Sequence, residues 1–258
     1  MIEGLGQLLE LGEEALALAV LVFMRVGGIA ALLPGFGEQS VPVRVRVAVA
    51  LAFTMVVWPM VAETLTVDPE RPFVVLMLIE GGIGLMIGLS FRLLVMALQL
   101  AGTIAAQSTS LAQVLGPSVA PDPMPAIGNI LTIAGITLAL VAGLHVKAAI
   151  AMAASYGIVP LGAAPSGADV ATWGTARVAE AFAFAFTLAA PFLIAALVYN
   201  VALGAINKAM PQLMVAFIGA PAITGAGILI LLLAGPLILT AWGGRLDGLL
   251  ADPLGLAR

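Results

Sequence analysis

The chain alternates between six long apolar stretches and shorter connections that carry prolines, acidic residues and glycines. The stretches run over residues 15–35, 43–62, 73–100, 126–158, 178–206 and 213–243. An α-helix needs about 20 residues to cross the hydrocarbon core of a bilayer, and each stretch reaches that length. The pattern therefore predicts an all-α polytopic membrane protein of about six helices.

Glycine and proline occur inside several of these stretches. The interior positions are Gly27, Gly28, Pro59, Pro191, Gly225, Gly227 and Pro236. The third and fourth stretches are also longer than one crossing requires. We therefore expect broken helices and tight hairpins in place of six straight rods. Gly84 and Gly88 form a GxxxG spacing that permits close helix approach, a weak signal among 29 glycines.

The connections differ in composition. Residues 34–42 predict a turn, 63–72 an acidic loop and 160–174 a loop of small residues. Residues 116–125 contain four of the sixteen prolines, which predicts an irregular backbone. The start of the chain carries four glutamates where a signal peptide would be positively charged, so we expect a mature N-terminus.

Composition supports the membrane assignment and narrows the function. Of the 258 residues, 62% are hydrophobic and 9% are charged, whereas a typical soluble domain has about 25% charged residues. The formal net charge of −4 argues against nucleic acid as a partner, and the absence of cysteine excludes disulfides and thiolate metal sites. We expect one membrane domain over 1–258, with possible sub-units 1–177 and 178–258 and no separate soluble domain.

Two charged residues lie deep inside the apolar stretches. A cation such as Arg25 at the middle of a helix costs at least ~2.5 kcal/mol to insert. Glu80 is similarly enclosed, and Arg92 would be about 18 Å away along the same helix at ~1.5 Å per residue. Each charge therefore needs a polar partner, and Glu80 needs one on another helix or chain. We favour a packing role for Arg25 and Glu80 over a proton or ion relay, because no chain of acidic residues accompanies them.

Polar residues also follow one face of the third stretch. Gln99, Thr103 and Gln107 are spaced four residues apart and share a helical face. They form either a hydrogen-bonding seam between helices or a lining that meets water or a translocating chain. The following residues 111–125 are too irregular for a helix and too apolar for an exposed loop, so we expect them to pack inside an assembly.

Catalytic chemistry finds little support. His145 is the only histidine, which leaves no HExxH motif and no histidine cluster for a metal. Asp122 and Asp169 form no obvious pair within the membrane, and no Walker-type phosphate loop is present. We expect no catalytic residue, no metal site and no cofactor, and we interpret His145 as packed or interfacial.

Several short elements occur along the chain in a characteristic order. Arg25 is followed by Pro34 and by the element Val41–Arg44. Residues 83–112 form a glycine-containing stretch that leads into a glutamine-bearing polar stretch, and Gly143–His145 lies in the next apolar stretch. In this order the elements resemble the FliR family of flagellar biosynthesis proteins and its virulence-secretion relatives.

The most specific match lies near the end of the chain. The family's Leu-Gly, Asn, Pro-Gln and Ile-Gly-x-Pro pattern corresponds to Leu203, Gly204, Asn207, Pro211, Gln212, Ile218, Gly219 and Pro221. The resemblance thus spans about the whole chain. We interpret Asn207, Pro211, Gln212, Gly219 and Pro221 as a hairpin turn at the entrance side of a conduit, in preference to a direct substrate contact.

The resemblance implies an export-gate subunit of a type III secretion apparatus in the bacterial inner membrane. In that family one copy assembles with several copies of two smaller membrane proteins, FliP and FliQ, into a helical, cone-like complex of hairpins. An FlhB-like export switch protein, membrane lipid and unfolded protein substrates are the other implied partners. A flagellar basal body is preferred over a virulence system on overall similarity.

By position, the pore plug of that family falls on the loop after the third stretch. The corresponding residues are Gln107, Ser108, Leu111, Val114, Leu115, Gly116 and Pro117. Relatives often carry phenylalanine and Asp-Pro there, so the plug is assigned by location and not by residue identity. Two other functions stay open: a small-solute secondary transporter built from broken helices, and a scaffold without a conduit.

Overall fold

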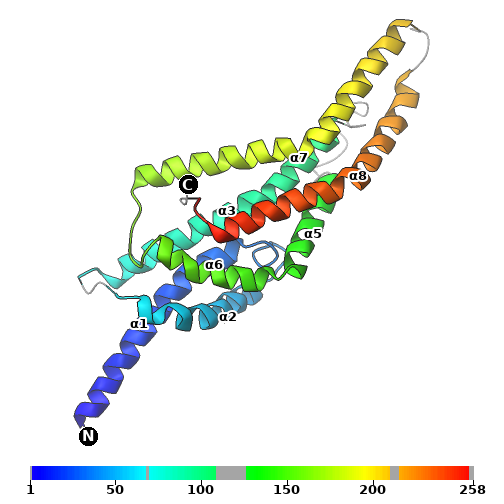
Figure 1. Cartoon of the computed structure of the whole chain (residues 1–258). Helices are drawn as coiled ribbons and strands as arrows, with labels where there is room; N and C mark the ends of the chain where they lie inside the picture. Colours follow the sequence, from blue (N-terminus) through cyan, green and yellow to red (C-terminus); the bar gives the residue numbers. More distant parts are fainter. Residues whose placement is uncertain (1, 68–69, 109–125, 210–214, 256–258) are drawn as a thin grey trace. The chain divides into compact units, whose positions relative to one another are not determined.

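A computed structural model describes residues 2–67, 70–108, 126–209 and 215–255 (Figure 1). Every regular element in these ranges is helical. In chain order they are α1 (Ile2–Leu32), α2 (Val43–Val61), the short 3-10 helix η1 (Ala62–Thr64), α3 (Phe73–Ser108), α5 (Ala126–Val141), α6 (Leu144–Ile158), α7 (Gly167–Ala209) and α8 (Val215–Ala251). The predicted all-α class is confirmed.

Five helical segments of the described chain are long and apolar enough to cross a membrane. They are Gly12–Leu32, Val43–Thr64, Phe73–Ser108, Gly167–Ile206 and Gly225–Ala251, and the bent pair α5–α6 makes a sixth if it is one span. The expectation of about six spanning segments is therefore confirmed. The segments follow the apolar stretches because a helix satisfies all its backbone hydrogen bonds internally, as hydrocarbon requires.

The fourth stretch is broken, and its break falls at a glycine. The α5 and α6 helices are bent by 76° relative to one another at the residues between them. Gly143 has φ of 80°, a left-handed conformation that glycine adopts without a Cβ clash. By contrast, α2 and α7 run through Pro59 and Pro191 without interruption.

The expected loop over 160–174 is wrong in its second half, where α7 has already begun at Gly167. The Ser166 hydroxyl accepts a hydrogen bond from the Asp169 backbone N–H at 3.1 Å and donates one to the Asp169 carboxylate at 2.7 Å. This is the side-chain capping that starts helices, and the spacing Ser-x-x-Asp is its sequence signal. Alanine and glycine around it obscure that signal.

The chain divides into two compact units. Unit 1 comprises residues 1–92, 139–174 and 246–258, and unit 2 comprises 93–138 and 175–245. The expected single membrane domain with sub-units 1–177 and 178–258 stays a prediction.

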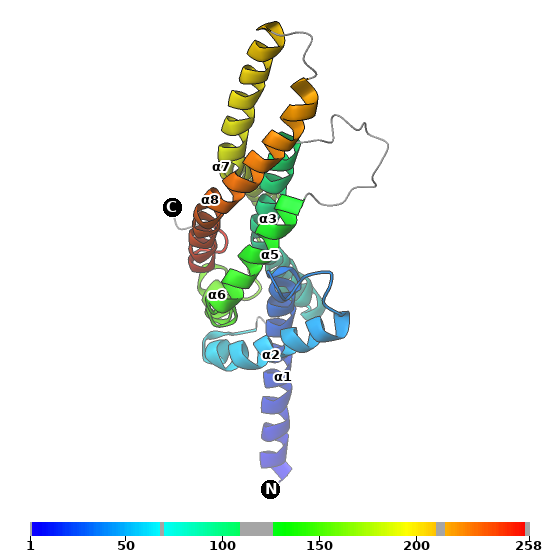
Figure 2. The ribbon, with the colours of Figure 1, turned by 90° about the vertical axis from the view of Figure 1, so that its right-hand side faces the viewer.

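The C-terminal half of α1 is buried inside unit 1. Its residues Leu21, Val22, Val26 and Leu33 are completely buried. Figure 2 shows α2 crossing α1. On another side, Gly28 of α1 meets the backbone of α3 at Gly84, and Gly88 meets the backbone at Gly28. These glycines allow the two helix backbones to approach directly.

The turn after α1 is fixed to α3 by a partly buried ion pair. The Nη1 of Arg92 donates to both carboxylate oxygens of Glu38, each at 3.1 Å. The pair joins the connection 33–42 to the middle of α3.

Unit 2 has its own buried contacts. The Trp242 side chain of α8 is 1% exposed, and its indole N–H donates to the Leu94 carbonyl of α3 at 2.9 Å. Gly102 of α3 and Gly128 of α5 bring their backbones into direct contact. The Glu180 carboxylate accepts from Arg177 at 3.0 Å and from Arg245 at 3.3 Å, which links α7 to α8.

Candidate functional site: a buried charge cluster

The candidate site lies inside unit 1, around the guanidinium of Arg25. Arg25 is on α1, and both its side chain and that of Glu80 on α3 are completely buried. The Arg25 Nε donates to Glu80 Oε2 at 2.7 Å, and Nη2 donates to Oε1 at 3.1 Å. Two parallel N–H···O contacts of this kind are the strongest geometry for an arginine–carboxylate pair.

The remaining side of the guanidinium faces the end of α6. Its Nη1 donates to the Val159 carbonyl at 2.8 Å and to the Ser155 carbonyl at 3.3 Å. Carbonyls at a helix C-terminus have no partners within the helix and carry the negative end of the helix dipole. The Ser155 carbonyl also accepts from the Val159 N–H at 2.9 Å, so Arg25 adds a second donor there. At the Val159 carbonyl, just past the end of α6, Arg25 supplies the donor.

An aromatic ring covers the guanidinium. The Cζ of Arg25 lies 3.9 Å from the centre of the Tyr156 ring, a cation–π distance. The Tyr156 hydroxyl is buried without a hydrogen-bond partner among the described residues. The ring, and not the hydroxyl, thus makes the contact with Arg25.

Gly162 completes the cluster from the connection between α6 and α7. Its N–H donates to Glu80 Oε1 at 2.9 Å, and its carbonyl accepts from Arg71 Nη1 at 2.6 Å. Gly162 has φ of 74°, so an L side chain there is strained. The left-handed turn presents the N–H to the buried carboxylate.

We call this group the Arg25 cluster: the side chains of Arg25, Glu80 and Tyr156, the backbone of Gly162 and the carbonyls of Ser155 and Val159. It joins α1, α3, α6 and the connection that follows α6. One positive and one negative charge compensate each other, and four N–H···O contacts hold the guanidinium. Such a closed network fixes helix positions and leaves neither charge free to bind a mobile ion.

Metal binding gains no support from the described part of the chain. No group of three or more His, Asp or Glu side chains in the described residues could hold a metal ion. His145 is exposed in the first turn of α6.

The polar face of α3 lies in the last third of that helix, whereas Glu80 of the Arg25 cluster lies near its start. Gln99 and Thr103 are half-buried and Gln107 is exposed. The hydroxyls of Thr103 and Ser108 donate to the carbonyls of Gln99 and Ala105, within α3. Of the expected plug, Gln107 and Ser108 end α3, whereas Leu111, Val114, Leu115, Gly116 and Pro117 lie outside the described residues.

The expected turn motif is described only in part. Asn207 belongs to the last turns of α7, and the backbone of Gly219 and Pro221 belongs to the start of α8. Pro211 and Gln212 lie outside the described residues. The roles assigned to these five residues stay a prediction.

Sequence reasoning singled out Arg25 and Glu80 but missed the other members of the Arg25 cluster. Tyr156 is one of only two tyrosines, which was the available signal, since a polar aromatic is uncommon in so apolar a stretch. Gly162 looked like an ordinary loop glycine. The Ser155 and Val159 carbonyls carry no sequence signal, because every residue has a carbonyl.

Together, the fold and the Arg25 cluster define a polytopic α-helical membrane protein in which the buried charges of Arg25 and Glu80 neutralise each other. The family model of bacterial export proteins, family 1, matches residues 16–249. The chain belongs to this family, and the resemblance to FliR is confirmed.

Three relatives illustrate the extent of the match, and each bears the name Flagellar biosynthetic protein FliR. The protein of Caulobacter vibrioides is 34% identical over 238 residues, which cover 90% of this chain and 94% of the relative. The Pectobacterium carotovorum protein is 28% identical, covering 84% and 83% of the two chains. The Aquifex aeolicus protein is also 28% identical and covers 88% of each.

Proposed function

We propose that this chain is a structural and gating subunit of the flagellar type III protein-export gate in the bacterial inner membrane. The observation that carries the proposal is the family match over residues 16–249, together with FliR-named relatives that align along nearly their whole length. The helices that can cross a membrane are consistent with this location. The subunit forms part of a conduit for unfolded export substrates.

The Arg25 cluster supports a structural role for the buried charges. Both charged side chains are fully buried and satisfied by one another and by backbone groups. A proton relay would need a group that can exchange its proton with a neighbour or with water. Arg25 and Glu80 instead hold α1, α3 and α6 in one arrangement, and energy for transport comes from other components.

The long helices α7 and α8 support assembly with other export components. At ~1.5 Å per residue, the 43 residues of α7 and the 37 residues of α8 extend about 65 Å and 55 Å, against about 30 Å of bilayer hydrocarbon. Large apolar side chains remain exposed along them, among them Ile194, Leu197, Val198, Val201, Leu229, Leu232, Leu233 and Leu237. Faces of this length need protein as well as lipid to cover them.

We assign FliP-like and FliQ-like membrane subunits as those covering partners, several of each to one copy of this chain, and an FlhB-like protein as the export switch. The gate is the segment that follows α3. Gln107 and Ser108 are the last residues of α3 before this segment, and Gln99 and Thr103 precede them on the same polar face of the helix. A permanently open conduit would dissipate the ion gradients across the membrane. The closed state therefore needs a seal, and a packed apolar segment can provide it.

Export by the living cell tests the proposal. Removing the chain from its own bacterium is expected to abolish secretion of flagellar filament protein into the medium, and the wild-type chain is expected to restore it. Normal secretion of that protein without the chain would overturn the proposal. A parallel assay of a virulence-type secreted protein distinguishes the flagellar system from a virulence system.

A further inference from the structure

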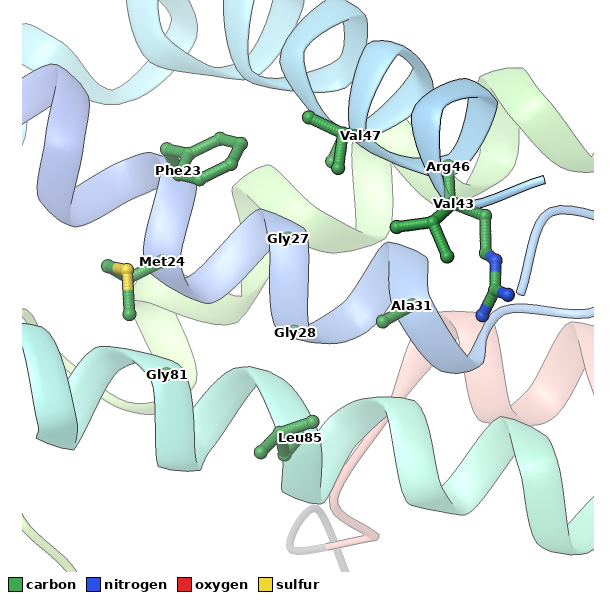
Figure 3. A pocket seen from close by; sticks show the side chains of 11 residues that line it. Phe23, Met24, Gly27, Gly28, Ala31, Val43, Arg46, Val47, Gly81 and Leu85 are labelled. Atoms are coloured by element: carbon green, nitrogen blue, oxygen red, sulfur yellow. The ribbon is translucent and has the colours of Figure 1, made fainter.

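A groove in unit 1 has no part in the function proposed above, and no residue of the Arg25 cluster lines it. It is about 370 Å³ in volume. Figure 3 shows it between α1, α2 and α3, with Gly27 and Gly28 on α1, Val43 and Val47 on α2, and Gly81 and Leu85 on α3. Carbon atoms of these residues form nearly its whole lining.

The groove has room because two of its lining residues, Gly27 and Gly81, have no side chain. A Cβ built on Gly27 would come no closer than 3.9 Å to the Phe23 ring, and one on Gly81 would lie 3.4 Å from the Met24 methyl group. A side chain would therefore fit at Gly27 and at Gly81, and its absence leaves empty space in the groove. Gly28 differs, since its Cβ would meet the backbone of α3 at 2.9 Å.

One cation lies at one end of this apolar groove. Figure 3 shows the guanidinium of Arg46 beside Ala31, next to Val43. Its Nε donates to the Val41 carbonyl at 3.0 Å, and no carboxylate of the described residues forms an ion pair with it. Arg46 belongs to the first turn of α2, at the start of the span Val43–Thr64. A membrane-spanning segment begins where lipid headgroups lie.

The lining of the groove favours a lipid as its occupant, because it is apolar along nearly its whole length and carries one cation at its end. A basic residue at the end of an apolar groove between membrane helices is the chemistry that recognises anionic phospholipids.

We propose that this groove binds one anionic phospholipid, with an acyl chain along Gly27, Gly28 and Gly81 and the phosphate at Arg46. The lipid fills the space left by the missing side chains of Gly27 and Gly81. It also provides the counter-ion that Arg46 lacks among the described residues. It thereby covers the apolar surface where α1, α2 and α3 meet.

Photo-crosslinking with lipid tests the proposal on the full-length chain, solubilised with its co-purifying proteins. The probes are phosphatidylglycerol and phosphatidylcholine that carry a photoreactive group on one acyl chain, in nanodiscs of otherwise equal composition. Mass spectrometry of the digested chain then locates the label. We expect phosphatidylglycerol to label residues 23–31, 43–50 and 81–85, and phosphatidylcholine to label them about fivefold less, which corresponds to ~1 kcal/mol for one basic residue.

Two pairs of variants make the result specific to the groove. Gly27→Leu fills the groove and is expected to abolish the label, whereas Gly82→Leu leaves it, because Gly82 is exposed, points into open space and does not line the groove. Arg46→Gln is expected to remove the preference for phosphatidylglycerol, whereas Arg44→Gln, at an exposed residue outside the groove, keeps it. Gly81→Leu fills the groove from α3 and replaces Gly27→Leu if that variant does not assemble.

Three results would overturn the proposal. The first is labelling by phosphatidylcholine as strong as that by phosphatidylglycerol, and the second is a label that persists when Gly27 and Gly81 are each replaced by Leu. The third is a photoreactive residue at position 47 that crosslinks to another protein chain instead of lipid. The last result would show that a protein occupies the groove.

Discussion

Gly84 packs directly against the backbone carbonyl of Arg25, the residue whose guanidinium binds Glu80. Glu80 and Gly84 are four residues apart and so lie on the same face of α3. One turn of α3 therefore supplies the carboxylate for the Arg25 side chain, and the next turn supplies the space for the Arg25 backbone. Close approach of the helices and charge pairing depend on each other at this crossing.

Gly84→Ala is expected to separate α1 from α3 and to weaken the Arg25 cluster. A methyl group at Gly84 would overlap the Arg25 carbonyl, which is backbone and cannot turn aside. Overpacking of this kind costs about 1–3 kcal/mol. The measurement is the midpoint of thermal unfolding in detergent, which should fall for Gly84→Ala. Gly82→Ala on the same helix is the control, since its Cβ meets nothing, and a fall of equal size there would contradict the account.

Arg25→Ala and Glu80→Ala are each expected to lower the recovery of the assembled complex. Removing one partner leaves the other charge buried without compensation, which costs about 3–5 kcal/mol in buried pairs. The amount of this chain that co-purifies with its partners measures the effect. Exposed Lys147→Ala, which breaks only the exposed pair with Asp247, is the control. Normal assembly with lost export would show instead that Arg25 and Glu80 act in transport.

Tyr156→Phe is expected to leave stability unchanged or to raise it. The ring that covers Arg25 is retained, and a buried hydroxyl without a described partner is removed. Tyr156→Leu keeps an apolar side chain but loses the cation–π contact, and its unfolding midpoint should fall. If Phe and Leu lower the midpoint equally, the hydroxyl and not the ring is the important group.

Gly162→Ala is expected to destabilise the chain by about 1–2 kcal/mol, the cost of a left-handed conformation for an L residue. Its Cβ would also press on the Leu76 side chain at 2.9 Å. Gly157→Ala on α6, where a Cβ meets nothing, is the matched control and should not destabilise. Equal unfolding midpoints for the two variants would mean that the turn at Gly162 can rearrange without loss.

Deleting residues 108–116 is expected to leave assembly intact and to raise ion permeability, as the proposed plug requires. Conductance of liposomes that contain the purified complex measures this directly. The matched control is a deletion of equal length from the start of α1, residues 2–10, outside the proposed plug. Unchanged permeability together with normal export would remove the plug assignment.

The helices could be predicted from the sequence because hydrocarbon imposes a strict length and apolar composition on each crossing. The break at Gly143 fell inside a stretch already too long for one span. Pro59 and Pro191 did not break their helices, since a proline removes one backbone hydrogen bond and its effect depends on what surrounds it. The early start of α7 depended on Ser166, a capping signal hidden among small residues.

The candidate site could be predicted only in part. Arg25 and Glu80 stood out because charge in an apolar stretch is costly, but their sequence positions could not show that they pair with each other. The Gly162 N–H and the Val159 carbonyl are backbone groups, so only the folded chain identifies them as ligands. Backbone partners are common for buried arginine and leave no pattern in the sequence.

The most direct test of the export-gate assignment is the subunit composition of the complex that contains this chain. Native mass spectrometry after gentle solubilisation from the chain's own bacterium gives that composition. The account predicts one copy of this chain with several copies of two smaller membrane proteins. A lone chain that carries a small solute across liposomes would contradict it and would identify a secondary transporter.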